Sequence, residues 1–236
     1  MDIHTLTQNF QTIQNNLNQF AQASHRNTQE ITVICVSKTV DIETIQSLYQ
    51  LGQRHFAENR PDPFLEKSRQ LQSSCPDIIW HYIGNLQRRP VKDIINQVDY
   101  LHSLDRLSLA KEIQKRRHTP LPCFLQVNVS QEASKSGFSP DELSEILQTI
   151  QDFDKIIIIG LMTMAPKEAS QKDIYTYFNK LHTLQKAIAD LKIPNVPCQE
   201  LSMGMSQDYP QAIAAGSTYL RIGSAFFDNL TLTSSN

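Results

Sequence analysis

The sequence predicts an α/β protein that folds as a single (β/α)8 barrel, a TIM barrel, with an extra N-terminal helix. Short apolar runs alternate with longer amphipathic runs along the 236 residues, and eight of the short runs can be counted. Regular strand–helix alternation requires a parallel sheet, and several runs, above all 156–161, are continuously apolar, as in strands buried on both faces. Eight such units fit a closed barrel near the small end of its usual size range. An open doubly wound sheet is the alternative, but no Gly-x-Gly-x-x-Gly pattern follows the first strand.

The N-terminal helix is predicted from apolar residues such as Leu6 and Ile13, which recur at three- and four-residue intervals as on one face of a helix. We assign residues 1–29 to this helix, residues 30–228 to the barrel and residues 229–236 to a polar C-terminal tail. The residues after the last strand are too few and too polar for a full closing helix. We therefore expect the N-terminal helix to cover that side of the barrel.

The strands are expected, in order, at 31–37, 55–58, 80–83, 100–104, 123–129, 156–162, 199–202 and 219–222. The first helix between strands ends at Gly52, and the second begins with Asp62 as its N-cap and Pro63 as its first residue. The remaining helical segments are expected at 91–96, 107–117, 141–150, 173–191 and 208–215.

Composition excludes several classes of function. With 22 Lys and Arg against 24 Asp and Glu, the chain has no broad cationic surface for nucleic acid. Its longest apolar run, 156–162, is far shorter than the roughly 20 residues that span a bilayer. The N-terminus lacks the pattern of a signal peptide, so we expect a cytoplasmic protein with neither membrane nor nucleic-acid partners. Neither the four cysteines nor the seven histidines follow a metal-binding spacing, so no metal is expected.

In a (β/α)8 barrel the functional site lies at the C-terminal ends of the strands, and the loops after strands 7 and 8 frequently bind phosphate. Here those loops are residues 202–206 and 221–224, which are rich in serine and glycine. Their backbone N–H groups and the start of the next helix can face an anion. Each segment alone is equally well explained as a turn, but the two together on adjacent strands favour phosphate binding. Glycines at strands 3, 6, 7 and 8, such as Gly84 and Gly160, would permit close approach of another backbone or of a ligand.

Lys38 follows the first strand. By two-residue alternation Ile34, Val36 and Lys38 share one face, so an inward-facing set would put the ammonium group at the mouth of the barrel. A lysine that is desolvated near other cations can attack a carbonyl to form an imine. The alternative is a solvated lysine at the start of a loop.

Seven separated motifs occur in order between about residues 30 and 228. They read VSKT (36–39), GQRHFAEN (52–59), WHYIGNLQ (80–87), SKSG (134–137), GLM (160–162), LSMGMS (201–206) and AAGSTYLRIG (214–223). Together they resemble the pyridoxal phosphate homeostasis proteins. That family is a single barrel similar to the N-terminal domain of alanine racemase and to fold-type III decarboxylases. The resemblance implies pyridoxal 5′-phosphate (PLP) as the cofactor.

The resemblance also implies roles for individual residues. The implied cofactor-binding residues are Lys38, Asn59, Met203, Met205, Ser206, Arg221, Gly223 and Ser224. Lys38 would carry PLP as a Schiff base, and Arg221 would face the pyridine nitrogen. A cation there disfavours protonation of that nitrogen and weakens the electron sink that most PLP enzymes use. No catalytic residue is assigned.

The remaining members of this set divide between the two ends of the cofactor. Ser206, Gly223 and Ser224 would hold the phosphate, whereas the asparagine and the two methionines would line the ring pocket. Lys135, in a polar loop after the fifth strand, is a solvated charge or a contact for a second PLP at the barrel mouth. Both interpretations remain open.

Two loops depart from the family pattern. Arg60-Pro61-Asp62-Pro63 stands where the family commonly continues with Tyr, a short residue, Gln and Glu, and Arg89-Pro90 stands where it often has an Asn-Lys pair. Both loops follow strands at the cofactor face. Their effect on contacts at the rim is left open, but Lys38 and the phosphate loops are not affected.

The function implied is that of a PLP carrier in vitamin B6, PLP and amino-acid homeostasis, without dedicated catalytic turnover. PLP-dependent apo-enzymes are the expected recipients and a monomer is the expected state, although the recipients, any regulatory partner and the oligomeric state are left open. The alternative is a small fold-type III PLP enzyme such as an amino-acid racemase or a transaminase-like catalyst. A Schiff-base aldolase without cofactor is disfavoured, because such lysines usually lie on later strands.

Overall fold

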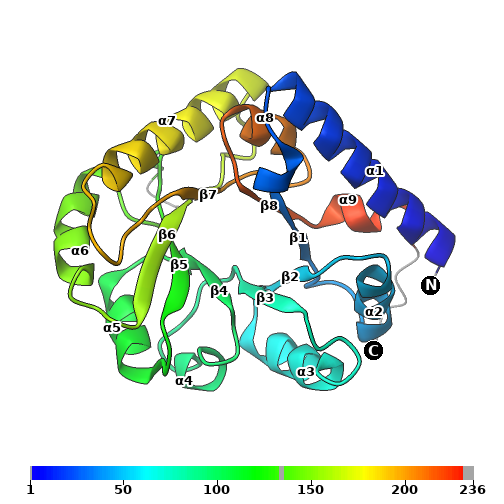
Figure 1. Ribbon diagram of the computed structural model, residues 1–236, viewed down its shortest axis with the longest axis horizontal. Helices are drawn as coiled ribbons and strands as arrows, with labels where there is room; N and C mark the ends of the chain where they lie inside the picture. The colour runs from blue at the N-terminus through cyan, green and yellow to red at the C-terminus, as the bar shows by residue number, and fades with distance from the viewer. Residues whose placement is uncertain (1, 133–135, 231–236) are drawn as a thin grey trace.

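The computed structural model describes residues 2–132 and 136–230, and its strands form a closed parallel barrel (Figure 1). Each strand pairs with the next in sequence, and the last pairs with the first, so the predicted (β/α)8 barrel is confirmed. The strands are β1 Thr32–Val36, β2 His55–Glu58, β3 Ile79–Tyr82, β4 Tyr100–Leu104, β5 Leu121–Gln126, β6 Ile156–Met162, β7 Glu200–Ser202 and β8 Tyr219–Ile222.

The helices form a ring around the strands (Figure 1). They are α1 Ile3–Ala23, α2 Ile42–Gln50, α3 Pro61–Leu71, α4 Val91–Ile94, α5 Leu107–Arg116, α6 Leu143–Ile150, α7 Gln171–Ala189, α8 Tyr209–Ala214 and α9 Ser224–Phe227, with 3-10 turns η1 Thr28–Glu30 and η2 Pro140–Glu142. The predicted start of α3 is wrong, because Arg60 is the N-cap and Pro61, not Pro63, is the first helical residue. Proline is favoured at that position because its fixed φ suits the first turn and the first turn does not use its N–H. The short helix α9 was not predicted.

Helix α1 completes the ring of helices. It packs against α8, α9 and α2, on the side of the barrel where the last described helix, α9, lies (Figure 1). Its apolar face buries Leu6, Ile13 and Leu17, and Phe10 lies against Phe226 of α9. The expectation that the N-terminal helix covers this side is therefore confirmed.

Strand residues divide between two apolar layers. The larger joins outward-facing residues such as Cys35 and Leu220 to the helices, and the smaller lies inside the barrel and consists of Ile34, Val36 and Ala57. The prediction that Ile34 and Val36 share one face is thus confirmed, and that face is the inside of the barrel. Much of the interior is polar, with His81, His102, Ser202 and Arg221 among its buried side chains.

Two glycines allow neighbouring backbones to approach too closely for any side chain. A Cβ atom on Gly84 would lie 2.0 Å from the carbonyl oxygen of Asn59, and one on Gly160 would lie 2.0 Å from that of Glu200. Close approach was predicted at both positions and is confirmed. A Cβ on Gly223 would meet its nearest neighbour, Val36, at an ordinary 3.5 Å, so packing within the chain does not require glycine there.

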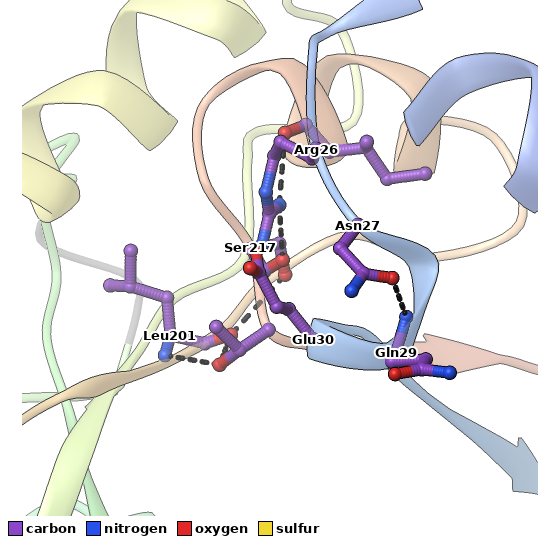
Figure 2. A network of polar contacts seen from close by, with 8 residues as sticks. Arg26, Asn27, Gln29, Glu30, Leu201 and Ser217 are labelled. Carbon is purple, nitrogen blue, oxygen red and sulfur yellow. Dashed lines mark hydrogen bonds and ion pairs between the residues drawn. The ribbon is translucent and has the colours of Figure 1, made fainter. Parts of the chain in front are cut away.

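Arg26 ties the segment between α1 and β1 to α8 and to the turn that follows it (Figure 2). Its guanidinium donates hydrogen bonds to the carbonyl oxygens of Ile213 at 3.1 Å and of Ser217 at 2.6 Å. The hydroxyl of Ser217 in turn donates to the carbonyl oxygens of Leu201, at 3.2 Å, and of Met203, at 2.7 Å. Arg26 therefore connects the N-terminal segment to the chain that links β7 with β8.

Replacing Arg26 with methionine should lower the free energy of unfolding by about 1.5–3 kcal/mol, because two carbonyl groups lose a charged donor. Urea unfolding followed by circular dichroism measures this. The control is Glu30→Ala, which removes only the 3.9 Å ion pair with Arg26 and should cost less than about 1 kcal/mol. An Arg26→Met protein as stable as the wild type would show that this connection contributes nothing to the fold.

Candidate functional site

The carboxyl ends of β7, β8 and β1 meet at one end of the barrel. Ile34 pairs with Arg221 in register, and Gly223 follows β8 beside Val36. The hydroxyl oxygen of Ser206, in the loop after β7, accepts hydrogen bonds from the N–H groups of Gly223 and Ala225, each at 3.2 Å. The two serine- and glycine-rich loops therefore converge next to the end of β1.

The role of Ser206 in this loop pair is partly structural. Its oxygen caps the start of α9, which is the turn role that the sequence left as the alternative to phosphate binding. Its own hydroxyl proton makes no contact among the described residues, and the exposed Ser224 adds a hydroxyl at the same place. These groups are neutral donors of the kind that bind phosphate oxygens.

Lys38 lies two residues beyond β1, in a turn at the barrel mouth. Its side chain is exposed, whereas the preceding Ser37 is buried. Lys38 thus lies at the mouth, and its exposed side chain matches the alternative of a solvated lysine at the start of a loop and not a desolvated amine. The amine is accessible to a ligand from solvent.

A buried ion pair that the sequence did not reveal contacts Ser37, the residue before Lys38. The Nζ atom of Lys67, on α3, donates to Glu58 Oε1 and to the carbonyl oxygen of Ser37, both at 2.8 Å. The hydroxyl of Ser37 also donates to Glu58 Oε1, at 2.7 Å. The other carboxylate oxygen of Glu58 is buried without a hydrogen-bond partner among the described residues. The start of the Lys38 turn is therefore fixed by a buried charge pair.

Arg221 is a buried cation inside the barrel, with 4% of its surface exposed. Its Nη1 atom donates to Ser202 Oγ at 2.5 Å, and its Nη2 atom donates to the carbonyl oxygen of Thr163 at 2.9 Å. Burial lowers the pKa of Arg221 to about 10, while the charge of Asp208 acts in the opposite direction. Since this pKa lies well above 7, the guanidinium is charged at pH 7. Among the described residues its hydrogen-bond partners are the neutral Ser202 hydroxyl and Thr163 carbonyl, and other N–H groups are left for a ligand.

The side chain of Met203 does not face the proposed ring pocket. Its side chain is completely buried in the outer core, because strand alternation puts Leu201 and Met203 outward and Ser202 inward. Met205, in the following loop, is 36% exposed and accessible from the mouth. Asn59 follows β2 and is partly exposed, with its backbone against Gly84.

Three histidines on neighbouring strands were also missed as site residues. His55, His81 and His102 form a hydrogen-bonded row inside the barrel that ends on Ser202, a partner of Arg221. Each histidine stands at an inward-facing position of its strand, and this parity is the signal that could have revealed them. Among the described residues, no group of three or more His, Cys, Asp or Glu side chains is placed to hold a metal ion.

The two loops that depart from the family pattern both begin helices. Arg60 is the N-cap of α3 and Pro90 that of α4. Lys135 lies outside the described residues, as do residues 231–236 of the expected C-terminal tail. No helix in the described ranges is long and apolar enough to cross a membrane.

Comparison with known proteins gives a consistent result. Residues 8–229 match the model of the family "Alanine racemase, N-terminal domain". The chain is 38% identical over 194 residues to a pyridoxal phosphate homeostasis protein of Aquifex aeolicus, covering 81% of this chain and 83% of that protein. It is 34% identical over 230 residues to one of Pasteurella multocida, covering 94% and 97%. The structure of PipY from Synechococcus elongatus with PLP bound superposes with a TM-score of 0.79 at 28% identity, covering 89% of this chain and 99% of that one.

Proposed function

The chain belongs to the alanine racemase N-terminal domain family and, within it, to the pyridoxal phosphate homeostasis proteins, and from this we propose that it binds PLP reversibly as a cytoplasmic carrier. In this role it would hold PLP as a Schiff base on Lys38 and take part in vitamin B6 and amino-acid homeostasis without dedicated turnover. The names of the relatives and the PLP-bound PipY structure support the proposal. The observation that carries it in this chain is the convergence of an accessible amine, a phosphate-type loop pair and a buried guanidinium at one barrel end.

The donor set fits the chemistry of PLP. Lys38 offers the exposed amine, Ser206 and Ser224 offer neutral donors for the phosphate, and Gly223 leaves room beside Val36. When bound, PLP supplies an aldehyde that joins an amine covalently and a ring that draws electrons from the carbon so joined. The residues of this chain bind and orient the group at both ends.

Arg221 favours a carrier over a catalyst. Arginine has only donors and is buried here with its charge, so it would oppose protonation of a ring nitrogen that faces it. An unprotonated ring is a weaker electron sink than a protonated one, so it would stabilise a substrate carbanion less. No contact in the described residues favours the racemase alternative.

The test is direct. Protein mixed with PLP should turn yellow, and borohydride should bleach the colour and add the mass of one reduced PLP to the peptide that contains Lys38. The same protein should not interconvert D- and L-alanine above the rate of free PLP. Absence of any adduct would refute the proposed carrier role, and rapid interconversion would replace it with the racemase.

Recognition of the phosphate gives a second expected result. Pyridoxal, which lacks the phosphate, should bind at least about tenfold more weakly than PLP, because charge-assisted hydrogen bonds contribute about 1.5–3 kcal/mol each. Millimolar inorganic phosphate should compete with PLP and leave pyridoxal binding unchanged. Absorbance titrations measure both effects. Equal affinity for pyridoxal and PLP would remove Ser206, Gly223 and Ser224 from the proposed site.

A further inference from the structure

A continuous hydrogen-bond chain crosses the inside of the barrel. The Nδ1 atom of His55 lies 2.9 Å from Nε2 of His81, and Nδ1 of His81 lies 2.8 Å from Nε2 of His102. The Nδ1 atom of His102 lies 2.8 Å from Ser202 Oγ, to which Arg221 donates at 2.5 Å. Five side chains from β2, β3, β4, β7 and β8 are therefore linked one to the next.

The direction of every hydrogen bond in this chain follows from the bond between Arg221 and Ser202. Arginine can only donate, so Ser202 Oγ accepts from Arg221. The one acceptor for the hydroxyl proton of Ser202 among the described residues is Nδ1 of His102. A neutral imidazole with an accepting Nδ1 carries its proton on Nε2, so His102 donates to His81 and, by the same step, His81 donates to His55. All three rings are then the Nε2–H tautomer.

The surroundings support neutral rings in this row. Burial lowers the pKa of both His81 and His102 well below the usual range, and the neighbouring histidines and, for His102, Arg221 add to the effect. The two rings stack on aromatic side chains, His81 on Tyr100 at 4.7 Å and His102 on Phe124 at 4.4 Å between centroids. Stacking holds each ring in the plane that its two hydrogen bonds need.

The two ends of the row open at opposite ends of the barrel. Arg221 lies toward the proposed cofactor site, whereas His55 begins β2 at the other end. His55 is partly exposed and lines a surface pocket of about 430 Å³ together with Gln14, Asn18, Thr32 and Gln53. Its Nε2–H group has no partner in the described ranges and is free to donate into that pocket.

We propose that Ser202, His102, His81 and His55 are positioning residues for Arg221, joined in a one-way chain that keeps the Ser202 hydroxyl turned away from the guanidinium. A hydroxyl fixed in this way always accepts from Nη1. The guanidinium is held at Ser202 and Thr163, which would leave its remaining N–H groups to face the ring nitrogen of PLP when that group is bound. This last step rests on the proposed function, whereas the direction of the chain does not.

The direction can be tested in protein free of PLP. Two-dimensional 15N–1H spectra of histidine rings at pH 7.5 distinguish the two neutral tautomers and the imidazolium. We expect His55, His81 and His102 each as the Nε2–H form, while the exposed His118 serves as the reference for a ring in free exchange. An Nδ1–H form or an imidazolium at His102 would overturn the chain.

Transmission along the chain distinguishes positioning from simple packing. In Ser202→Ala, His102 loses its donor, so His81 and His55 should both show mixed tautomers although neither touches residue 202. Ser202→Thr keeps the hydroxyl and should restore the wild-type spectrum. Unchanged tautomers of His81 and His55 in Ser202→Ala would show that the row has no common direction. If this variant fails to fold, His55→Phe at the open end serves instead: because the direction is set at Arg221, His81 and His102 should both keep the Nε2–H form, and an Nδ1–H form of either ring would overturn the chain.

The effect on the cofactor completes the test. Ser202→Ala should release PLP about tenfold faster than the wild type, the change expected when a buried charge loses one hydrogen bond, and Ser202→Thr should not. Equal release rates, with PLP bound normally by the wild type, would refute the positioning role alone. A wild type that binds no PLP would instead refute the proposed function, while the tautomer result would stand.

Discussion

A Lys38→Ala variant treated with PLP and then borohydride should carry no added cofactor mass, whereas the wild type gains one PLP per chain. The reason is chemical: the imine requires a primary amine at the barrel mouth, and alanine has none. Mass spectrometry of the intact protein measures the difference. The matched control is Lys111→Ala, which removes another exposed lysine, on α5, and should keep the adduct.

The same variant should keep its fold. Lys38 is exposed, so its truncation leaves no cavity, and PLP-free wild type and variant should unfold within about 0.5 kcal/mol of each other. A reducible adduct of unchanged stoichiometry in Lys38→Ala would mean that another lysine, such as Lys135, is the true anchor.

The largest loss of stability is expected from Lys67→Met. Glu58 is completely buried, and Lys67 is its charged partner at 2.8 Å. Removing one member of a buried ion pair leaves the other charge without compensation and typically costs about 3–5 kcal/mol. Here the second carboxylate oxygen already lacks a partner among the described residues, so the upper part of this range is expected.

Urea unfolding of Lys67→Met measures this cost, and two further variants make the result specific. Lys155→Met breaks an exposed pair with Asp154 and should cost less than about 1 kcal/mol. The double variant Glu58→Gln, Lys67→Met removes both charges and should recover part of the loss. A cost for Lys67→Met no greater than that for Lys155→Met would show that the pair contributes as little as an exposed one.

The sequence was sufficient for the barrel and for the position of Lys38. Strand alternation depends only on local order along one strand, so the residues of β1 alone predict that Ile34 and Val36 share one face, whereas the structure is needed to show that this face is the inside of the barrel. The same reasoning, applied to β7, would have placed Met203 on the face opposite Ser202. Its assignment to the ring pocket came from the resemblance and not from parity.

What the sequence did not reveal depends on which residues of different strands and helices face each other. The row from His55 to Arg221 needs the register of neighbouring strands, which no spacing within the sequence encodes. The pair of Lys67 and Glu58 likewise depends on how α3 packs on the barrel. The sequence therefore predicted single site residues such as Lys38, whereas the side chains that hold them in place depend on how distant segments pack together.

Because α1 completes the ring of helices, its position affects the order in which the protein can fold during synthesis. Helix α1 is synthesised before the barrel strands, but two of the helices that it packs against, α8 and α9, begin only at Tyr209 and Ser224. Until these segments have been synthesised, the apolar stripe that contains Leu6, Ile13 and Leu17 lacks two of the helices that it packs against. Closure of the ring of helices must therefore wait for α8 and α9, and until then part of this stripe stays open to non-native contacts.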